Sequence, residues 1–326
     1  MKVSKLHYGL SLTVVLFMTI VFTSACATFK PSQDSQKITS FPNTSLSSVS
    51  FAREKMSREG INPLFISKIE KRYLKHYTNE ERDRIIQLNV LGFLNPGDHS
   101  LHFSKRAVKN IKIFIKKYSK TLKNAESAYN VPKEIIASLL WVETRHGKAM
   151  GQFDLSSVFF ALLQANHPEV ARNTLVELNY RKPSSKSSAA NYSYTELQNK
   201  VAQRLNSKST WAMEQIKAME SLYTPSKYQN YFPDIISTRG SFAGAFGCSQ
   251  FIPSSFKKYA VSSKSSKSPN LFDIKDCIFS VANFLRKSGW ETQNPKACSD
   301  ALFEYNRVRD YGEVIVKLAE AAKEHY

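Results

Sequence analysis

One glutamate lies where a carboxylic acid would be expected to keep its proton. In the segment 131–147, VPKEIIASLLWVETRHG, helical spacing puts Glu143 on the same face as Ile136, Leu139 and Leu140. That face is apolar, and removing a carboxyl group from water raises its pKa by disfavouring the charged form. The C-terminal end of a helix adds negative potential, which acts in the same direction. Glu143 is therefore a candidate general acid near neutral pH, able to protonate a departing oxygen.

Two observations weigh against a simple assignment. Most enzymes that cleave glycosidic bonds use a pair of carboxylates, and the other acids considered, Asp154 and Glu169, sit in no recognisable motif. A glutamate at a helix end can also be purely structural, here through a salt bridge to Arg145 or Lys148. Both interpretations of Glu143 remain open on spacing alone.

A second segment, 240–256, reads GSFAGAFGCSQFIPSSF. Its glycines let the backbone approach a ligand closely and adopt positive φ. Ser241, Ser249 and Gln250 could then face a bulky polar ligand. The structural alternative is tight helix packing over small residues, and we expect both to apply. The glycines lack the GxGxxG and GK[ST] spacings of phosphate-binding loops.

The elements that must position these residues are predicted to be helices. Asn130-Val131-Pro132 separates two of them, and Gly147 is a natural helix stop. Trp290, at the end of FLRKSGW, is expected in the core. No alternating strand series and no internal repeat is present. The predicted helices are 105–130, 132–147, 195–222, 273–287 and 310–323, and the predicted polar loop is 181–193.

The motifs resemble those of the membrane-bound lytic murein transglycosylase B family, whose members cut the glycan strands of bacterial peptidoglycan. Val142-Glu143-Thr144-Arg145 followed by Gly147 matches one family block, with His146 at a variable position that we interpret as a helix-end or surface residue. The segment 240–254 matches a second block, with Ile252 in place of Met. Phe303-Glu304-Tyr305-Asn306 matches a third. The resemblance extends over roughly 63–322.

The resemblance implies a role for each matched residue. Glu143 would act first as acid and then as base, with Arg145 as an orienting partner. Ser241 would position the substrate N-acetyl group, and Gln250, Tyr305 and Asn306 would bind sugar, with Tyr305 supporting the acid or stacking. One acid then suffices at the MurNAc–GlcNAc β-1,4 bond, because the N-acetyl group assists and the 6-hydroxyl closes a 1,6-anhydro ring.

The resemblance also implies a mainly α, lysozyme-like (goose-type) catalytic core in residues 51–326, with a helical insertion at about 173–237 and a smaller accessory lobe. We expect a monomer that needs no cofactor. Many relatives carry an acidic calcium loop, but here the interval 262–270 reads SSKSSKSPN. Asp273 alone cannot hold calcium, which needs several oxygen ligands, so we expect no metal.

Two other functions remain possible. The first is a muramidase that uses water, with the same acid and an unrecognised second carboxylate. The second is a non-catalytic, peptidoglycan-binding envelope lipoprotein, against which the presence of Glu143, Ser241 and Gln250 argues.

Residues 1–25 are predicted to be an export signal. Lys2 and Lys5 precede the apolar run 10–22, which is short for a membrane span. The small residues before Cys26 resemble the bacterial lipoprotein cleavage box. Cys26 would then be lipidated, and Ala27 after it favours an outer-membrane anchor facing the periplasm. The alternative is a plain signal peptide with an incidental cysteine. The polar segment 26–50 is predicted to be a flexible tether.

The chain carries a formal net charge of +19. An exported protein rarely meets nucleic acid, so we expect peptidoglycan strands and the membrane as partners, not nucleic acid. A lysine-rich solvated surface is an equally good explanation of the charge.

Cys248, Cys277 and Cys298 remain after Cys26. The compartment permits disulfides, but buried free thiols are the simpler expectation.

Overall fold

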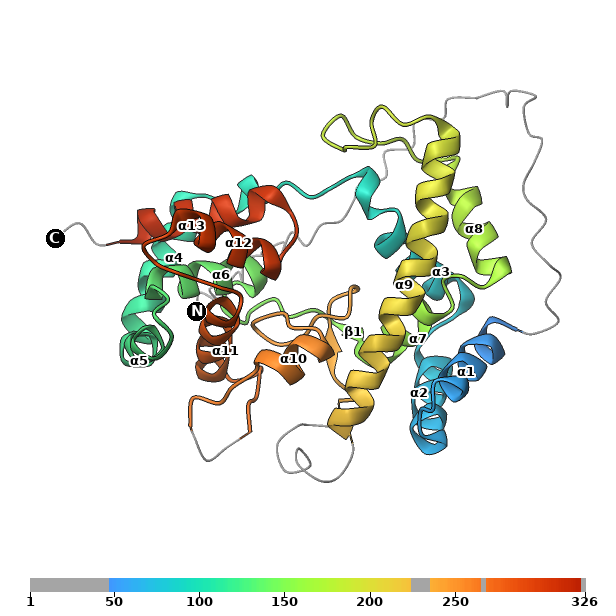
Figure 1. Ribbon diagram of the computed structural model, residues 1–326, viewed down its shortest axis with the longest axis horizontal. Helices are drawn as coiled ribbons and strands as arrows, with labels where there is room; N and C mark the ends of the chain where they lie inside the picture. Colours follow the sequence, from blue (N-terminus) through green and yellow to red (C-terminus); the bar gives the residue numbers. More distant parts are fainter. Residues whose placement is uncertain (1–46, 224–234, 265–267, 324–326) are drawn as a thin grey trace, which may run out of the picture. The chain divides into compact units, whose positions relative to one another are not determined.

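The protein is described from a computed structural model that covers residues 47–223, 235–264 and 268–323 (Figure 1). The chain divides into Met1–Phe41 and Pro42–Tyr326, and only the second unit contains described residues. The export signal, Cys26 and most of the predicted tether therefore lie outside them. The first helix begins at Ser48, within the tether predicted for 26–50, because the Ser47 side chain accepts the amide of Ser50 and caps the helix.

The described residues form thirteen α-helices, two short strands and two turns of 3-10 helix, which confirms the mainly α class. In chain order the elements are α1 (Ser48–Arg58), α2 (Pro63–His76), α3 (Asn79–Val90), η1 (Gly92–Leu94), η2 (His99–His102), α4 (Lys105–Lys117), α5 (Ser119–Tyr129), α6 (Lys133–Thr144), β1 (Phe153–Asp154), α7 (Leu155–Leu163), α8 (Pro168–Leu178), α9 (Tyr194–Tyr223), β2 (Arg239–Gly240), α10 (Pro253–Tyr259), α11 (Ile274–Lys287), α12 (Pro295–Tyr305) and α13 (Arg309–Ala322).

The helix predicted over 105–130 is two helices, α4 and α5, with a break at Tyr118. Both pieces contact α6, but α4 also contacts α13 whereas α5 contacts α11. A straight helix could not serve both contacts, so the break follows from tertiary packing and not from a Pro or Gly. Asn130 ends α5 in the left-handed conformation, with φ 53°.

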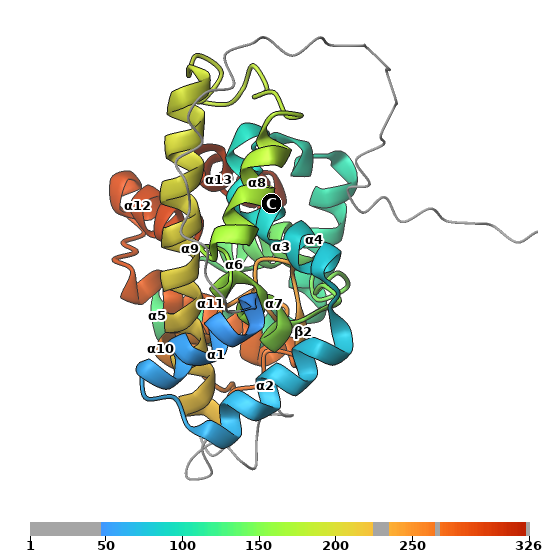
Figure 2. The same ribbon diagram turned by 90° about the vertical axis from the view of Figure 1, so that its right-hand side faces the viewer.

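Two groups of helices build the core. In one group α6 is surrounded by α4, α5, α11 and α13, and in the other α7 is covered by α2, α3 and α9 (Figures 1 and 2). Nearly every side chain of α6 and α7 is buried, as the all-round apolar sequences of these two helices require. Helix α10 contacts both α9 and α11, and so joins the two groups.

A two-residue antiparallel ladder brings together segments that are distant in sequence. Phe153 of β1 pairs with Gly240 of β2, and Asp154 pairs with Arg239. The ladder thereby sets the loop that follows Glu143 against the glycine-rich segment. Gly151 is essential to this approach, because a Cβ atom there would lie 2.2 Å from the carbonyl oxygen of Gly240 and 2.6 Å from the Ser241 amide nitrogen.

The long helix α9 runs alongside α7 and also contacts α3, α8 and α10 (Figures 1 and 2). It confirms the helix predicted over 195–222, and the segment between α8 and α9 is the predicted polar loop. The predicted insertion boundary at 173 falls inside α8, and its limits of 173–237 stay a prediction. None of the helices in the described part of the chain is both long and apolar enough to cross a membrane.

The expectation of free cysteines is wrong for two of the three. Cys248, in the glycine-rich segment, forms a disulfide with Cys277 of α11, and Cys298 is free. The bond fastens the loop that follows Gly247 to a core helix. Helical spacing could not predict it, because the pairing depends on how the loop returns to α11.

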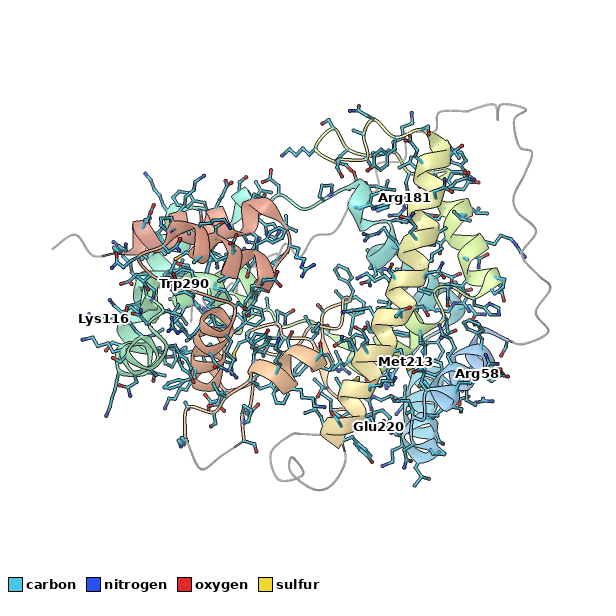
Figure 3. All side chains as sticks on the ribbon, in the orientation of Figure 1. Arg58, Lys116, Arg181, Met213, Glu220 and Trp290 are labelled. Atoms are coloured by element: carbon cyan, nitrogen blue, oxygen red, sulfur yellow. A yellow bond between two sulfur atoms is a disulfide. The ribbon has the colours of Figure 1, made fainter. Side chains whose placement is uncertain are left out.

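Basic residues cover the exposed side of α4 and α5. No acidic residue occurs between Asp98 and Glu126, and Lys116 projects away from the molecule in Figure 3. By contrast Trp290, at the end of α11, is only 3% exposed, as predicted for a core residue. The exposed basic residues are Lys105, Arg106, Lys109, Lys112, Lys116, Lys117, Lys120 and Lys123.

Candidate active site

The candidate acid lies in the last turn of α6. This helix ends at Thr144, earlier than the stop predicted at Gly147, because Arg145 and His146 are both left-handed with φ values of 53° and 59°. The amide of His146 donates to the carbonyl of Leu140 and closes the helix end. Two consecutive non-glycine residues in this conformation are strained, so other contacts must hold them.

Those contacts come from both side chains. The His146 ring stacks on Phe114 at 3.8 Å, and its Nε2 lies 2.9 Å from the carbonyl oxygen of Ala137. Burial lowers the pKa of His146 to about 4, so the ring is neutral. His146 is thus a helix-end residue, as predicted, but its ring is packed and not on the surface.

Arg145 does not orient Glu143 as the family resemblance implied. Its Nη1 donates to the carbonyl of Trp141 at 3.0 Å, and its Nη2 donates to Nδ1 of His102 at 2.8 Å. Burial and the neighbouring guanidinium lower the pKa of His102 to about 4, which leaves the imidazole neutral and able to accept. Arg145 therefore holds the helix end in place.

Glu143 is half-buried, and burial raises its pKa to about 7. One hydrogen bond opposes that shift. The hydroxyl of Tyr311 donates to Oε1 of Glu143 at 2.5 Å, which favours the charged carboxylate. The salt bridges to Arg145 and Lys148 that would have made Glu143 structural do not form in the described residues. Glu143 is thus poised between its two protonation states near neutral pH.

Two parallel tyrosine rings stand beside the acid. Tyr305 and Tyr311 stack at 6.2 Å with an interplanar angle of 12°, and burial raises the pKa of both hydroxyls. Tyr305 donates to the carbonyl of Ser249 at 2.5 Å. The hydroxyl that contacts the acid therefore belongs to Tyr311 and not to Tyr305. No spacing rule could identify Tyr311, because only the packing of α13 on α6 brings it to Glu143.

The residue after the acid connects it to the glycine-rich segment. The Thr144 hydroxyl donates to the carbonyl of Cys248 at 2.8 Å and accepts the amide of Gly147 at 2.9 Å. The disulfide at Cys248 and the Tyr305 contact at Ser249 hold the same loop from two other sides. Glu143 is thus connected to this loop through the residue that follows it.

Ser241 begins a tight turn in this segment. Its amide donates to the carbonyl of Ala245 at 2.7 Å, and its Oγ accepts the amide of Ala245 at 3.1 Å. Gly244 turns the chain with φ +77°, and a Cβ atom there would meet the Phe159 ring at 2.2 Å. The predicted tight packing over small residues is confirmed here, against a core ring of α7, whereas the approach to a ligand stays a prediction.

Gln250 ends the segment in the left-handed conformation, with φ 50°. Its Nε2 donates to the carbonyls of Gly247 and Met150, so the amide nitrogen is used inside the protein. Its Oε1 makes no hydrogen bond within the described residues and can accept one from a ligand. Ser249, in contrast to the prediction, is fully buried and does not face a ligand.

The structure therefore brings together Glu143, Gln250 and Tyr305, with Ser241 joined to them through Gly151. Asn306 follows Tyr305 at the end of α12, and its side chain makes no hydrogen bond within the described residues. The last predicted site residue, Cys26, lies outside those residues.

The other acids considered for catalysis are placed elsewhere. The Asp154 carboxylate accepts the Ser157 amide at the start of α7 and the Nε of Arg72 at 2.5 Å, which occupies both oxygens. Glu169 is exposed in the first turn of α8. The influences on the pKa of Glu143 are burial and Tyr311, and neither is a second carboxylate.

The carboxylates near the interval 262–270 are already used within the protein. Asp273 accepts the Lys275 amide and caps α11, and Asp276 accepts the amides of Ser263 and Asn270. The remaining side chains of the described part of this loop are mainly serine and lysine, which do not suit the ion. The donor set therefore does not fit calcium.

The half-buried acid, the tyrosine pair and the glycine-rich turn on a mainly α core define a transglycosylase-type site. Residues 99–306 match the model of the Transglycosylase SLT domain, and the chain belongs to this family. It is 30% identical over 183 residues to membrane-bound lytic murein transglycosylase B of Escherichia coli (strain K12). This match covers 56% of the chain and 38% of that protein, so the chain spans about two fifths of the length of this curated relative.

Solved structures share the fold. The lytic transglycosylase Slt35 of Escherichia coli, in complex with calcium, is 18% identical with a TM-score of 0.57, over 84% of this chain and 92% of that one. The soluble lytic transglycosylase SltB1 of Pseudomonas aeruginosa is 18% identical with a TM-score of 0.58, over 85% of this chain and 98% of that one. SltB3 of Pseudomonas aeruginosa, in complex with NAG-anhNAM-pentapeptide, is 14% identical with a TM-score of 0.52, over 84% of this chain and 78% of that one. The predicted lysozyme-like, mainly α fold is thereby confirmed.

Proposed function

We propose that this protein is a lytic transglycosylase that cleaves the MurNAc–GlcNAc β-1,4 bond of peptidoglycan and leaves a 1,6-anhydro-MurNAc end. The observation that carries the proposal is Glu143, a carboxyl group with a pKa of about 7 held by the Tyr311 hydroxyl beside the glycine-rich turn. The relative from Escherichia coli is named as a murein transglycosylase, and SltB3 was solved with a fragment that ends in an anhydro sugar.

In the first step Glu143 acts as the acid. Tyr311 occupies Oε1, so the proton resides on Oε2 and passes to the glycosidic oxygen as the bond to C1 breaks. The carbonyl oxygen of the substrate N-acetyl group supports the positive charge that develops at C1. Half-burial of Glu143 favours this transfer, because the protonated acid is the stable form below about pH 7.

In the second step the same residue acts as the base. Glu143 is now a carboxylate, stabilised by the Tyr311 hydroxyl, and it accepts the proton of the sugar 6-hydroxyl as that oxygen bonds to C1. The ring closes without water, and Glu143 recovers its proton. One carboxylate serves both steps, which agrees with the absence of a second carboxylate among the influences on its pKa.

The remaining residues would hold the glycan. Ser241 would position the N-acetyl group from its tight turn, and the free Oε1 of Gln250 would accept a sugar hydroxyl. Asn306 offers an unused amide beside Tyr305, whose ring lines the same region.

Lipidation at Cys26 and attachment to the outer membrane, facing the periplasm, belong to this proposal. They are supported by the sequence before Cys26 and by the membrane-bound name of the relative.

The first prediction concerns the product and its dependence on Glu143. Digestion of purified peptidoglycan should release muropeptides with anhydro ends, lighter by one water than hydrolysed ends, as measured by mass spectrometry. Glu143→Gln should reduce the rate by about 10²–10⁴-fold, because a positioned general acid contributes that much.

The matched control is Glu169→Gln, an exposed glutamate that should leave the rate unchanged. Hydrolysed ends in place of anhydro ends would identify a water-using muramidase instead. Wild-type rates in Glu143→Gln would remove this residue from the mechanism.

A further inference from the structure

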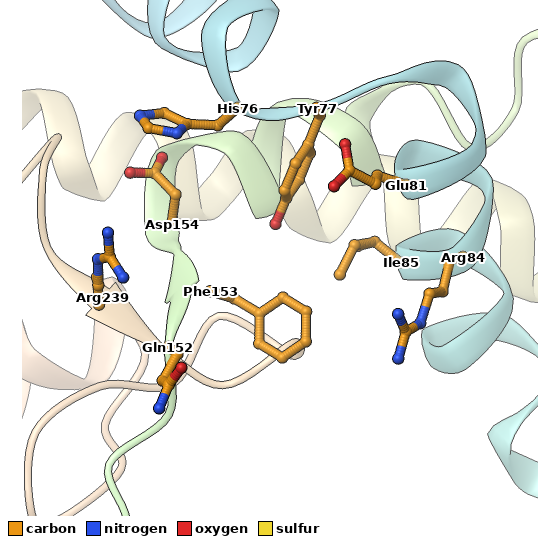
Figure 4. A pocket seen from close by; sticks show the side chains of 9 residues that line it. All are labelled: His76, Tyr77, Glu81, Arg84, Ile85, Gln152, Phe153, Asp154 and Arg239. Carbon is orange, nitrogen blue, oxygen red and sulfur yellow. The ribbon is translucent and has the colours of Figure 1, made fainter. Parts of the chain in front are cut away.

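A pocket lies between the α2–α3 junction and the β1–β2 ladder (Figure 4). Its volume is about 270 Å³. Phe153 lines it from β1 and Gln152 from just before that strand, Tyr77 and Arg84 line it from the α2–α3 side, and Arg239 lines it from β2. The pocket thus collects donors from three segments that are distant in sequence.

Two arginines enter this pocket without an anionic partner. Arg84 and Arg239 lie on opposite sides of it (Figure 4), and neither guanidinium forms a hydrogen bond or ion pair with the described residues. Asp154, the nearest carboxylate of β1, is already paired with Arg72 at 2.5 Å. Both guanidinium groups are therefore free to bind an anion, and their planar donor geometry suits a carboxylate.

A tyrosine hydroxyl also faces the pocket unused. The hydroxyl of Tyr77 is buried and has no hydrogen-bond partner in the described residues. Burial, then Asp154 and Glu81, raise the pKa of Tyr77, so the hydroxyl keeps its proton and can donate. A buried polar group without a partner is costly, and a ligand oxygen would relieve that cost.

The pocket is continuous in sequence and space with the site. Arg239 directly precedes the Gly240–Ser241 turn, and Gln152 follows Gly151, which contacts that turn. The Phe153 ring meets the ring of Phe242, the residue after Ser241, at 6.4 Å. A group attached to a sugar bound at Ser241 could therefore extend over Phe242 and Phe153 to the two arginines.

We propose that this pocket binds the peptide stem of the peptidoglycan substrate, through a stem carboxylate held between Arg84 and Arg239. The inference rests on the proposed function. The glycan backbone presents mainly hydroxyl and amide groups, whereas the stem carries free carboxylates, so unpaired guanidinium groups favour the stem. Glu81, which also lines the pocket, accepts the Thr78 amide through Oε2, and its other oxygen would accept an ammonium group of the same peptide. The pocket would therefore select strands that still carry peptides.

The second prediction tests this assignment with two substrates, peptide-bearing glycan strands and the same strands stripped of peptides by an amidase. Arg84→Ala and Arg239→Ala should each lower kcat/KM on the peptide-bearing strands by roughly tenfold. On stripped strands each variant should match the wild type. Lysine at either position should restore part of the loss. Arg172→Ala, an exposed arginine of α8, is the matched control and should change neither rate.

Binding of the free pentapeptide, measured by calorimetry, provides a readout that does not depend on cleavage. The wild type should bind it, and the double variant Arg84→Ala/Arg239→Ala should not. Equal losses on both substrates, or unchanged peptide binding in the double variant, would overturn the assignment. Failure of the proposed function is recognised separately, because the wild type would then cleave neither substrate.

Discussion

At the scale of single residues, the candidate chemistry depends on two opposing influences on one carboxyl group. Burial raises the pKa of Glu143, and the hydrogen bond from Tyr311 lowers it. The balance lies near pH 7, where both the acid and the base form are accessible. Tyr311 is therefore a positioning residue that also tunes the acid.

The third prediction follows from the sign of that hydrogen bond. The acid must be protonated, so activity should be present below about pH 7 and be lost as the pH rises through that value. Tyr311→Phe removes the stabilisation of the charged form and raises the pKa of Glu143 further. The descending limb of the kcat profile should shift to higher pH, and kcat should fall by about 10–100-fold because the carboxyl group loses its orientation.

Tyr305→Phe is the matched control for this profile. Its hydroxyl binds the Ser249 carbonyl, and it is not among the influences on the pKa of Glu143. The variant should raise KM without shifting the descending limb of the kcat–pH profile. If the descending limb of the kcat–pH profile stayed at the same pH in Tyr311→Phe, this tyrosine would not set the pKa of Glu143.

The sequence predicted the acid but not its partner. Helical spacing was sufficient to place Glu143 on an apolar face, because that relation is local. The Tyr311 contact joins residues 168 positions apart, and the roles of Arg145 and Ser249 likewise depend on neighbours that a single helix pattern does not contain. Within the site, the sequence interpretation was incomplete at Tyr311 and wrong at Arg145 and Ser249.

At the scale of elements, glycines set the distance between the two site segments. Gly151 has φ +89° and faces the backbone of Gly240 and Ser241, with no room for a side chain. The two-residue ladder then fixes the register of these segments. The position of Ser241 relative to Glu143 therefore depends on the lack of a Cβ atom at Gly151.

The fourth prediction separates close approach from backbone conformation. Gly151→Ala must displace the Gly240 backbone, so activity should fall at least tenfold and stability by about 2–4 kcal/mol. Gly60→Ala is the control, since Gly60 also has positive φ, +75°, but nothing within 4 Å of the added Cβ. It should cost only about 1 kcal/mol and leave activity unchanged. Denaturant unfolding measures the stability of the two variants, and cleavage assays measure their activity. Equal effects of Gly151→Ala and Gly60→Ala would contradict the role given to the close approach at Gly151.

The helices themselves were largely predictable, as the agreement of 195–222 with α9 and of 273–287 with α11 illustrates. Both carry long apolar patterns with clear end signals. The break at Tyr118 and the end of α6 at Thr144 were not predictable, because no Gly or Pro marks them. In each case contacts with another helix override the local pattern.

At the scale of the whole molecule, the Cys248–Cys277 bond joins the site to the helical core across a sequence separation of 29. A closed loop of this length restricts the unfolded chain and stabilises the fold by about 3.5 kcal/mol. The same bond holds the Cys248 carbonyl that receives the Thr144 hydroxyl.

The fifth prediction is that Cys248→Ala/Cys277→Ala lowers Tm by about 5–10 °C, measured by calorimetry, and reduces activity. Cys298→Ala should change neither quantity, because Cys298 is free. If the double variant melted with the wild type, the bond would contribute nothing to the stability of the native protein.

The exposed cations of α4 and of the first part of α5 have a consequence for how such a protein binds an insoluble polyanion. Exposed charges attract over about 10 Å at 0.1 M ionic strength and over less as salt is added. Adsorption to an anionic wall polymer therefore weakens with rising salt, whereas a proton transfer inside the half-buried site is screened far less. Raising the ionic strength should therefore weaken binding to the polymer while changing the rate of bond cleavage much less.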